Sequence, residues 1–541
     1  MRSMKIRLLA LCMALTMLLC GCTDIYDYFL NRLGASSYAN VHYDQMEYTR
    51  PDVDAVVEAF DDCIEYAADA KKVTTLEDKI SQCFWQHNSF YTNYNLALIR
   101  YYSNVNDTYW EQENDYCMER APKVDAALEE LYYALAKCPL REELEQGEMF
   151  EEGFFDEYME GSAPTEEFVA LQEKEAALLN QYYDLSAESA AAQYYSREFF
   201  EVYGSQMGDV FVEMVKVRQQ LATEAGYDSY MDYAYDKVYS RDYTPEQATD
   251  YLEELCRELV PLYVEIAPDA AYSNLEMCTP GQMFTFVKDT AAVMGGKISE
   301  AFQVMERRGV YNIGYSEDKY NISFEVYLPN YEVPFVFVNP VGNQGDMLTF
   351  AHEFGHFCNE YASYGSMVGI DVAEVFSQAM EFLCLSYGQV DEDLKKWKMV
   401  DTLRLFVEQS AYALFEHRVY ALEESELTAE NIYAIYEEVC KSFGFEIWNW
   451  DSRDFVVVNH FFSAPLYIIS YVVSNDTAFR IYQLEQAETG AGLALFEDSL
   501  DTEEASLLGF LREVGLESPF EPGRLQTVGE TIENALKKEP A

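Results

Sequence analysis

The segment His352-Glu353-Phe354-Gly355-His356 decides how the rest of this 541-residue sequence is interpreted. In an α-helix, residues four positions apart lie on the same face, so the two histidines project side by side. Two imidazoles in this arrangement can bind one Zn²⁺ ion, and Glu353 lies beside them, one residue further around the helix. The spacing therefore predicts a zinc-binding helix.

A bound zinc ion lowers the pKa of a water molecule toward neutrality, and a neighbouring carboxylate can then take its proton. Glu353 is placed to be that general base in a hydrolytic reaction. The chain contains only 6 histidines, so this motif is expected by chance in about one of a hundred such sequences. The motif favours a zinc hydrolase over a helix with two incidental histidines.

A catalytic zinc site usually has three protein ligands and keeps its fourth position open. A second helical pattern begins near Asp371, and Glu374 lies on its apolar part, where an unpaired carboxylate is costly. We prefer Glu374 as the third ligand, with Glu381 and Asp371 as alternatives. Glu381 could instead orient a histidine ligand, and Asp371 could be a helix N-cap, as Asp346 could be for the zinc helix.

The motif HEFGH, followed by Glu374 and Ser377 in a Glu-x-x-Ser pattern, resembles the thimet oligopeptidase and oligoendopeptidase F family of zinc metallopeptidases. The likeness extends over roughly residues 200 to 482 and includes the stretches 225–230 and 241–244. It implies one zinc ion per chain, with Glu374 as the third ligand. The interval from His356 to Glu374 is 18 residues, shorter than expected for the family, which predicts a different loop with the same ligands.

In this family a histidine and tyrosines from a later loop stabilise the oxyanion of the reaction. The matching segment here is 459–471, where His460 corresponds to the family histidine. Tyr467 and Tyr471 are the two candidates for the tyrosine hydroxyl. Pro465 stands in a segment that lacks the family's glycines, so the register of the tyrosines is left open.

The pattern of apolar residues at three- and four-residue spacing predicts helices over most of residues 28–260. Two stretches rich in β-branched and aromatic residues, 320–328 and 333–338, predict short strands. Pro334 suits an edge strand, which could pair with an extended peptide near residues 335–338. Helix is expected again until near Leu516, with a final short helix at 528–537.

The resemblance implies a mainly α, two-lobed zincin-type peptidase with a deep substrate channel. The small β-sheet should lie beside the zinc helix. We divide the chain into a signal segment at 1–22, an N-terminal helical region at 23–199 and a catalytic region at 200–541.

The remaining histidines, His42, His87 and His417, lack such neighbours in the sequence. We interpret them as surface residues or as structural residues with satisfied hydrogen bonds. Arg418 could form a salt bridge or contact a substrate carboxylate, and the sequence does not choose between these roles.

The N-terminus is typical of an export signal, with a short basic segment followed by an apolar stretch from Leu8 to Leu19. The following Cys20-Gly21-Cys22 resembles a bacterial lipobox, which would make Cys22 the lipidated first residue. An ordinary secretory signal is the alternative. We therefore expect a lipid-anchored protein on the outer face of the bacterial cytoplasmic membrane.

The net charge of −58 opposes binding to nucleic acid and to anionic lipid surfaces. We therefore expect no nucleic-acid partner and no membrane contact except through the lipid anchor. The charge would attract cationic ligands, but solubility of an exported protein is the favoured explanation.

These observations predict a zinc oligoendopeptidase that hydrolyses internal bonds of short peptides through a water molecule activated by Glu353. One alternative keeps the zinc but cuts at chain ends, as a peptidyl-dipeptidase or carboxypeptidase. The other is a non-catalytic peptide-binding lipoprotein on the same scaffold.

Overall fold

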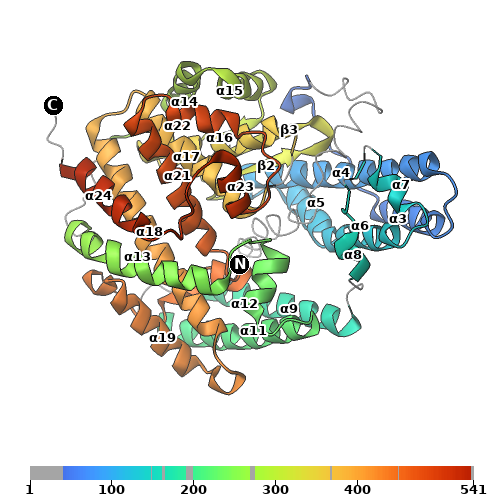
Figure 1. Ribbon diagram of the computed structural model, residues 1–541, viewed down its shortest axis with the longest axis horizontal. Helices are drawn as coiled ribbons and strands as arrows, with labels where there is room; N and C mark the ends of the chain where they lie inside the picture. Colours follow the sequence, from blue (N-terminus) through green and yellow to red (C-terminus); the bar gives the residue numbers. More distant parts are fainter. Residues whose placement is uncertain are drawn as a thin grey trace.

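The computed structural model describes residues 40–147, 149–150, 152–160, 165–189, 199–267, 275–365, 368–448 and 450–537 (Figure 1). The predicted signal segment at 1–22, with Cys22, lies outside these residues. In the described part of the chain, no helix has both the length and the apolar character needed to cross a bilayer.

Helices dominate the described chain before the sheet, as the sequence predicts for residues 28–260, and two further helices lie between that range and the first strand. They are α3 (Val53–Ala67), α4 (Val73–Ser103), α5 (Thr108–Met118), α6 (Ala121–Ala136), α7 (Arg141–Glu145), α8 (Asp156–Glu160), α9 (Glu166–Ser189), α11 (Ser205–Glu224), α12 (Tyr230–Tyr233), α13 (Pro245–Ile266), α14 (Pro280–Met294) and α15 (Gly296–Arg308). A short 3₁₀ helix and two π-helical turns accompany them: η3 (Tyr43–Gln45), η4 (Phe200–Gly204) and η5 (Ala234–Val238).

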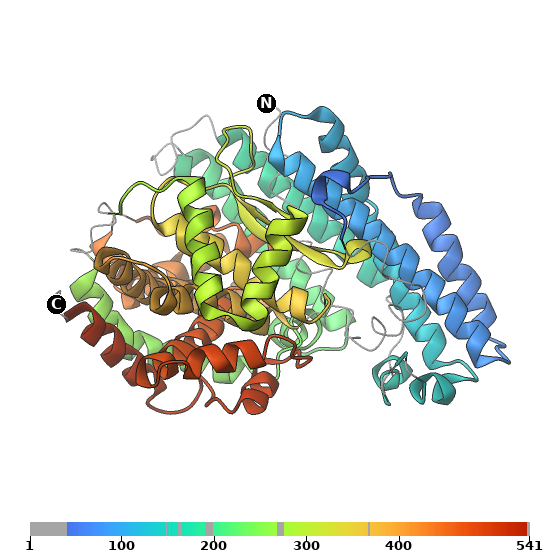
Figure 2. The same cartoon turned by 90° about the horizontal axis from the view of Figure 1, so that it is seen from above.

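Helix α3 shows how the sequence forms these elements. Asp52 caps its N-terminus by accepting a hydrogen bond from the Ala55 N–H. The predicted apolar spacing places Val53, Val56 and Phe60 on one buried face. This face packs against α4 and α6, and Figures 1 and 2 show α3 to α6 together at one end of the molecule.

The sheet has three strands, β1 (Tyr311–Asn312), β2 (Ser323–Leu328) and β3 (Val333–Val338), in the order β1-β3-β2. Strand β3 runs antiparallel to β2 and parallel to β1. The two predicted strands are therefore confirmed. The first begins at Ser323 instead of residue 320, because the Tyr320 N–H donates to the Tyr102 carbonyl of α4.

The prediction that β3 is an edge strand is wrong. It is the central strand, and all six of its residues are buried. Pro334 lies opposite Tyr327 of β2, whereas β1 reaches only Val336 and Phe337. The missing N–H of Pro334 is therefore not needed on the β1 side. Val336 and Phe337 cannot pair with an extended peptide, because β1 and β2 lie on either side of them.

Helices follow the sheet, as predicted. They are α16 (Gly345–Ala362), α17 (Ile370–Tyr387), α18 (Glu392–Tyr420), α19 (Ala429–Ser442), α20 (His460–Ser463), α21 (Ile469–Ala487), α22 (Ala491–Asp498), α23 (Leu507–Val514) and α24 (Arg524–Lys537). Short 3₁₀ helices occur at η7 (Pro329–Tyr331), η8 (Glu424–Glu426), η9 (Phe445–Ile447) and η10 (Asp454–Val457). The predicted final helix is present and begins at Arg524, four residues before the expected start.

Helix α16 carries the HEFGH motif and packs against β3, β2 and α17, and α17 in turn packs against α21 (Figure 1). Phe335 and Phe337 of β3, together with Phe350 and Phe354 of α16, have no exposed surface. The small sheet thus lies beside the predicted zinc helix, and the apolar faces of both elements bury each other.

Candidate active site

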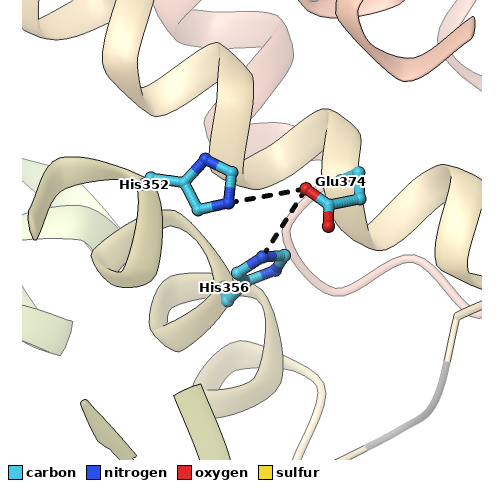
Figure 3. A group of neighbouring side chains, drawn as sticks. All are labelled: His352, His356 and Glu374. Atoms are coloured by element: carbon cyan, nitrogen blue, oxygen red, sulfur yellow. Dashed lines mark ion pairs between the residues drawn. The ribbon is translucent and has the colours of Figure 1, made fainter. Parts of the chain in front are cut away.

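Helix α16 presents His352 and His356 from one face, as the spacing requires (Figure 3). Their ring centroids are 5.1 Å apart, and the rings are nearly perpendicular at 82°. The helix begins one residue before the predicted cap, because Asp346 lies in its first turn and Gln344 is the N-cap. Asp346 instead accepts hydrogen bonds from the N–H groups of residues 341, 342 and 343, so the predicted N-cap role is wrong.

Glu374 reaches the two histidines from α17 (Figure 3). Its Oε2 lies 3.5 Å from His352 Nε2 and 3.9 Å from His356 Nε2. The ligand atoms of the three residues all lie within 4.8 Å of one another. Glu374 is buried and is held by Ser377, whose hydroxyl donates to Oε2 at 2.9 Å.

Gly355 explains how α17 comes so close to the zinc helix. A Cβ atom at this position would lie 2.5 Å from the Phe376 carbonyl oxygen and 2.7 Å from Ser377 Cα. Backbone atoms cannot move aside as a flexible side chain can. The glycine inside HEFGH is therefore required for the contact that places Glu374 opposite the histidines.

The three residues fit a zinc ion. Ligands about 2.0–2.2 Å from a tetrahedral zinc lie roughly 3.3–3.6 Å apart, close to the separations of Glu374 from each histidine. Burial and the positive charge of His352 lower the pKa of His356 well below its usual value, so His356 is a neutral imidazole with a free lone pair. Two nitrogens and one carboxylate oxygen are a ligand set that zinc prefers.

Glu381 lies behind His352, as the sequence predicts for a residue that orients a ligand. Its Oε1 is 2.9 Å from His352 Nδ1, and its Oε2 accepts a hydrogen bond from Lys398 at 2.6 Å. Burial would raise the pKa of Glu381, but Lys398 and His352 lower it below its usual range. An ionised Glu381 holds the proton on Nδ1 and leaves Nε2 directed toward Glu374.

Negative charge is concentrated at this site. Burial opposes protonation of His352, but its hydrogen bond to Glu381 and the charge of Glu374 raise its pKa to about 9. Burial also raises the pKa of Glu353 to about 7, although His352 lowers it. A divalent cation would balance these carboxylates, and a base whose pKa lies near neutrality suits general-base chemistry.

The segment 459–471 approaches from the other side and brings His460, Tyr467 and Tyr471 together. The Tyr471 hydroxyl is 3.5 Å from His460 Nε2, and the Tyr467 hydroxyl donates to Glu374 Oε1 at 3.4 Å. Burial lowers the pKa of His460 to about 4, so its ring is neutral. Burial raises the pKa of both tyrosines, so both keep their protons and can donate hydrogen bonds.

Asp371 is neither an N-cap nor part of the ligand group. Helix α17 begins at Ile370 with Gly369 as its N-cap, and Asp371 is buried in the first turn. Its Oδ2 accepts a hydrogen bond from Tyr243 at 2.8 Å and lies 3.5 Å from Arg241 Nε. The sequence suggested an N-cap because Asp371 precedes an apolar run. In the structure its carboxylate instead contacts Arg241 and Tyr243, which are far away in the chain.

Other predicted residues lie in structural roles. His417 is buried between the hydroxyls of Tyr235 and Thr249, at 2.9 and 2.8 Å. His42 caps η3, and His87 lies 3.7 Å from an Asp125 carboxylate oxygen. Arg418 forms an ion pair with Glu438 at 2.9 Å, which resolves the choice that the sequence left open.

Sequence reasoning missed Lys398, Arg241 and Glu416, which support the site from behind. Each has an ionisable side chain and less than a tenth of its surface exposed. Buried charges are rare unless they are paired. Lys398 and Glu416 lie among the buried residues of α18. An ionisable residue among the apolar positions of a predicted helix is the signal that could have identified these two.

Comparison with known families gives two matches along the chain. The Peptidase M3 N-terminal domain matches residues 43–158, and Peptidase family M3 matches residues 296–493, which includes HEFGH, Glu374 and His460. Together the two segments span more than half of the sequence. Comparison with curated protein sequences found no match.

Solved structures share the fold at low sequence identity. A protein assigned as oligoendopeptidase F superposes with a TM-score of 0.77 at 19% identity, covering 92% of this chain and 99% of that chain. Pz peptidase A with an inhibitor gives a TM-score of 0.77 at 19% identity, covering 91% and 99%. A protein assigned as oligoendopeptidase F from Bacillus anthracis gives 0.75 at 21%, covering 92% and 98%.

Two histidines and a glutamate converging beside a further glutamate, on a mainly helical fold with a small sheet, define a metallopeptidase. The chain belongs to peptidase family M3, which confirms the family that the sequence motifs predict, and its substrates are peptides.

Proposed function

We propose that this chain is a zinc oligoendopeptidase that cleaves internal bonds of short peptides. The observation that carries the proposal is the convergence of His352, His356 and Glu374, with Glu353 next to the first histidine on α16. These three residues would hold one zinc ion. Zinc bound there supplies a Lewis acid and lowers the pKa of water toward neutrality.

Glu353 is the base in this proposal. Its carboxylate takes a proton from the attacking water and then delivers that proton to the leaving amide nitrogen. The pKa of about 7 that burial gives this residue supports both the uptake and the release of a proton near neutral pH. The leaving amine thereby departs without a full negative charge.

The segment 459–471 supplies hydrogen bonds to the substrate carbonyl oxygen as negative charge develops on it. The Tyr467 hydroxyl already lies 3.4 Å from the Glu374 carboxylate, next to the reacting groups. His460 and the Tyr471 hydroxyl lie against each other at 3.5 Å. Three neutral donors from one segment can surround a developing oxyanion.

Two cations near the site are paired with carboxylates, and this favours cleavage at internal bonds over cleavage at chain ends. A carboxypeptidase needs a cation that binds the terminal carboxylate of its substrate. Lys398 is paired with Glu381, and Arg241 lies 3.5 Å from Asp371, so neither positive charge is available for a substrate. The likeness in fold to oligoendopeptidase F supports the same choice.

An internally quenched peptide series with both ends blocked tests this proposal. We expect cleavage of the blocked peptides, loss of activity after treatment with a chelator, recovery with zinc, and one zinc ion per chain in metal analysis. Cleavage of peptides with free termini only would favour the exopeptidase alternative. Binding of peptides without cleavage at full zinc loading would favour the non-catalytic alternative.

We further propose that the chain is exported and anchored by a lipid on Cys22 at the outer face of the cytoplasmic membrane. The basic and apolar N-terminal pattern and the Cys20-Gly21-Cys22 sequence support this proposal. Cys22→Ser should release the protein from the membrane fraction and abolish labelling by a fatty-acid analogue. Cys20→Ser is the matched control and should remain anchored.

A further inference from the structure

Leu466 lies within the segment that carries His460 and Tyr467, and its backbone is in the left-handed region, with φ of 64°. A residue with a branched apolar side chain rarely adopts this conformation, because its Cβ approaches the following carbonyl oxygen. Glycine is the usual choice at such a position. A leucine held there must be stabilised by its surroundings.

Glu416 of α18 provides a direct contact with this residue. Its Oε1 accepts a hydrogen bond from the Leu466 N–H at 2.7 Å. Both residues are 1% exposed, so this hydrogen bond is shielded from bulk water. Among the described residues, no hydrogen-bond partner is seen for Glu416 Oε2.

The neighbouring backbone is held by other side chains. The Tyr239 hydroxyl donates to the Pro465 carbonyl at 2.7 Å, and Arg218 donates to the Phe461 carbonyl at 2.9 Å and to the Phe462 carbonyl. These contacts fix the chain before Leu466. Around Leu466 itself, the Tyr467 N–H donates to the Ala464 carbonyl at 3.2 Å and closes a turn, and Glu416 adds a side-chain hydrogen bond to the left-handed residue.

The position of Leu466 decides where Tyr467 points, because Tyr467 is the next residue in the chain. Its hydroxyl lies 3.4 Å from Glu374 Oε1, on the side of the site that segment 459–471 occupies. A change in the backbone angles at Leu466 would swing this hydroxyl away from Glu374. A displacement of about 1 Å at a reacting centre can cost on the order of 10²-fold in rate.

We propose that Glu416 is a positioning residue that holds Leu466 in the left-handed conformation and thereby sets the Tyr467 hydroxyl beside the ligand Glu374. This inference rests on the proposed function for its catalytic consequence. The hydrogen bond needs an oxygen acceptor and not a full negative charge. Burial raises the pKa of Glu416 to about 8, so a neutral side chain of the same shape should serve there.

Four variants test the proposal in the full-length protein. Glu416→Ala should lower kcat by about 10–100-fold with little change in KM or zinc content. Glu416→Gln should keep kcat within about threefold of the wild type, because the amide oxygen can still accept the hydrogen bond. The decisive pair combines Glu416→Ala with Leu466→Gly or with Leu466→Ala.

Glycine and alanine both remove the buried leucine side chain, but only glycine adopts positive φ without strain. We therefore expect Glu416→Ala/Leu466→Gly to recover most of the lost kcat, whereas Glu416→Ala/Leu466→Ala does not. Melting temperatures of all variants will show whether each is folded under the assay conditions. Equal kcat in the two double variants, or wild-type kcat in Glu416→Ala, would overturn the proposal.

Amide hydrogen exchange gives a readout that needs no activity. Peptides that cover residues 464–470 should exchange at least about tenfold faster in Glu416→Ala than in the wild type or in Glu416→Gln. Peptides from α16 serve as the internal control and should be unchanged. If the wild type hydrolyses no peptide, the proposed function fails, and unchanged exchange at 464–470 would separately reject the role of Glu416.

Discussion

The two sides of the active site are built in different ways. His352, Glu353 and His356 belong to one helix, so the period of the α-helix alone sets their mutual positions. His460, Tyr467 and Tyr471 belong to a segment with a four-residue helix, a left-handed leucine and contacts from residues 50 to 244 positions away in the chain. Local geometry specifies the first side, and tertiary contacts specify the second.

This difference predicts how each side should fail. Replacing a polar side chain on α16, such as that of Glu353, removes the chemistry of that group and leaves its neighbours in place. A substitution that disturbs segment 459–471 changes the positions of several donors at once. Variants on the two sides of the site can therefore separate these two kinds of failure.

The largest effect should follow Glu353→Gln on the helical side. Loss of the base is expected to lower kcat toward the upper end of about 10²–10⁴-fold, which is the range that general-base catalysis contributes. Zinc content measured by metal analysis should remain at the wild-type level, since Glu353 is not among the three ligand residues. A fully active Glu353→Gln variant would reject the mechanism.

Tyr467→Phe tests the other side and should lower kcat by about 10²-fold, because one oxyanion donor is lost. KM and zinc content should change little, since the ring and its packing remain. Tyr471→Phe, measured in parallel, decides which hydroxyl polarises the carbonyl. Tyr315→Phe is the control at an exposed tyrosine, and if it lowered kcat as much as Tyr467→Phe, the effect could not be assigned to the site.

The pH dependence should sharpen the assignment of the base. Glu353 acts in its ionised form, so kcat/KM should rise as pH increases through its pKa and fall about tenfold per pH unit below it. A bound cation lowers this pKa below the value of about 7 that burial produces, so the acid limb should have its midpoint below pH 7.

The pH profile has its own control. His460, whose pKa burial lowers to about 4, stays neutral over most of this range and should not add a second limb near neutrality. Zinc content is measured at each pH, because protons compete with zinc for the histidines. The absence of an acid limb down to the lowest pH at which zinc content stays constant would contradict the role of Glu353.

Gly355→Ala should have the smallest effect on the chemical groups but should disturb the contact between the two ligand helices. Its Cβ would lie 2.5 Å from the Phe376 carbonyl oxygen, so α17 must shift and Glu374 with it. We expect a loss of about 1–3 kcal/mol in the free energy of unfolding, together with weaker zinc affinity.

Gly281→Ala in α14 is the matched control for this substitution. Nothing lies within 4 Å of a Cβ at that position. Its stability, measured by denaturant unfolding in parallel, should be unchanged or slightly higher because alanine favours the helix. Equal stability of Gly355→Ala and the wild type would show that the helices are not packed through this glycine.

Much of this site follows from sequence alone. The helical spacing of His352 and His356, the carboxylate of Glu374 on an apolar helix and the strands around Pro334 are local patterns, and each corresponds to an element of the structure. The roles that sequence reasoning assigned wrongly were those of Asp346, Asp371 and β3. Asp371 contacts residues far away in the chain, and β3 is flanked by two other strands. Asp346 instead accepts hydrogen bonds from the turn directly before its own helix.

The sequence by itself determined the family, the mainly helical fold and the face of α16 that carries the histidines, because helix periodicity depends only on neighbouring residues. The tertiary structure alone decided that β3 is the central strand, that Arg241 forms an ion pair with Asp371 and that Leu466 adopts a left-handed conformation. These features depend on contacts between residues far apart in the chain. A buried carboxylate such as Glu416 stabilises a strained residue only when the fold brings the two together.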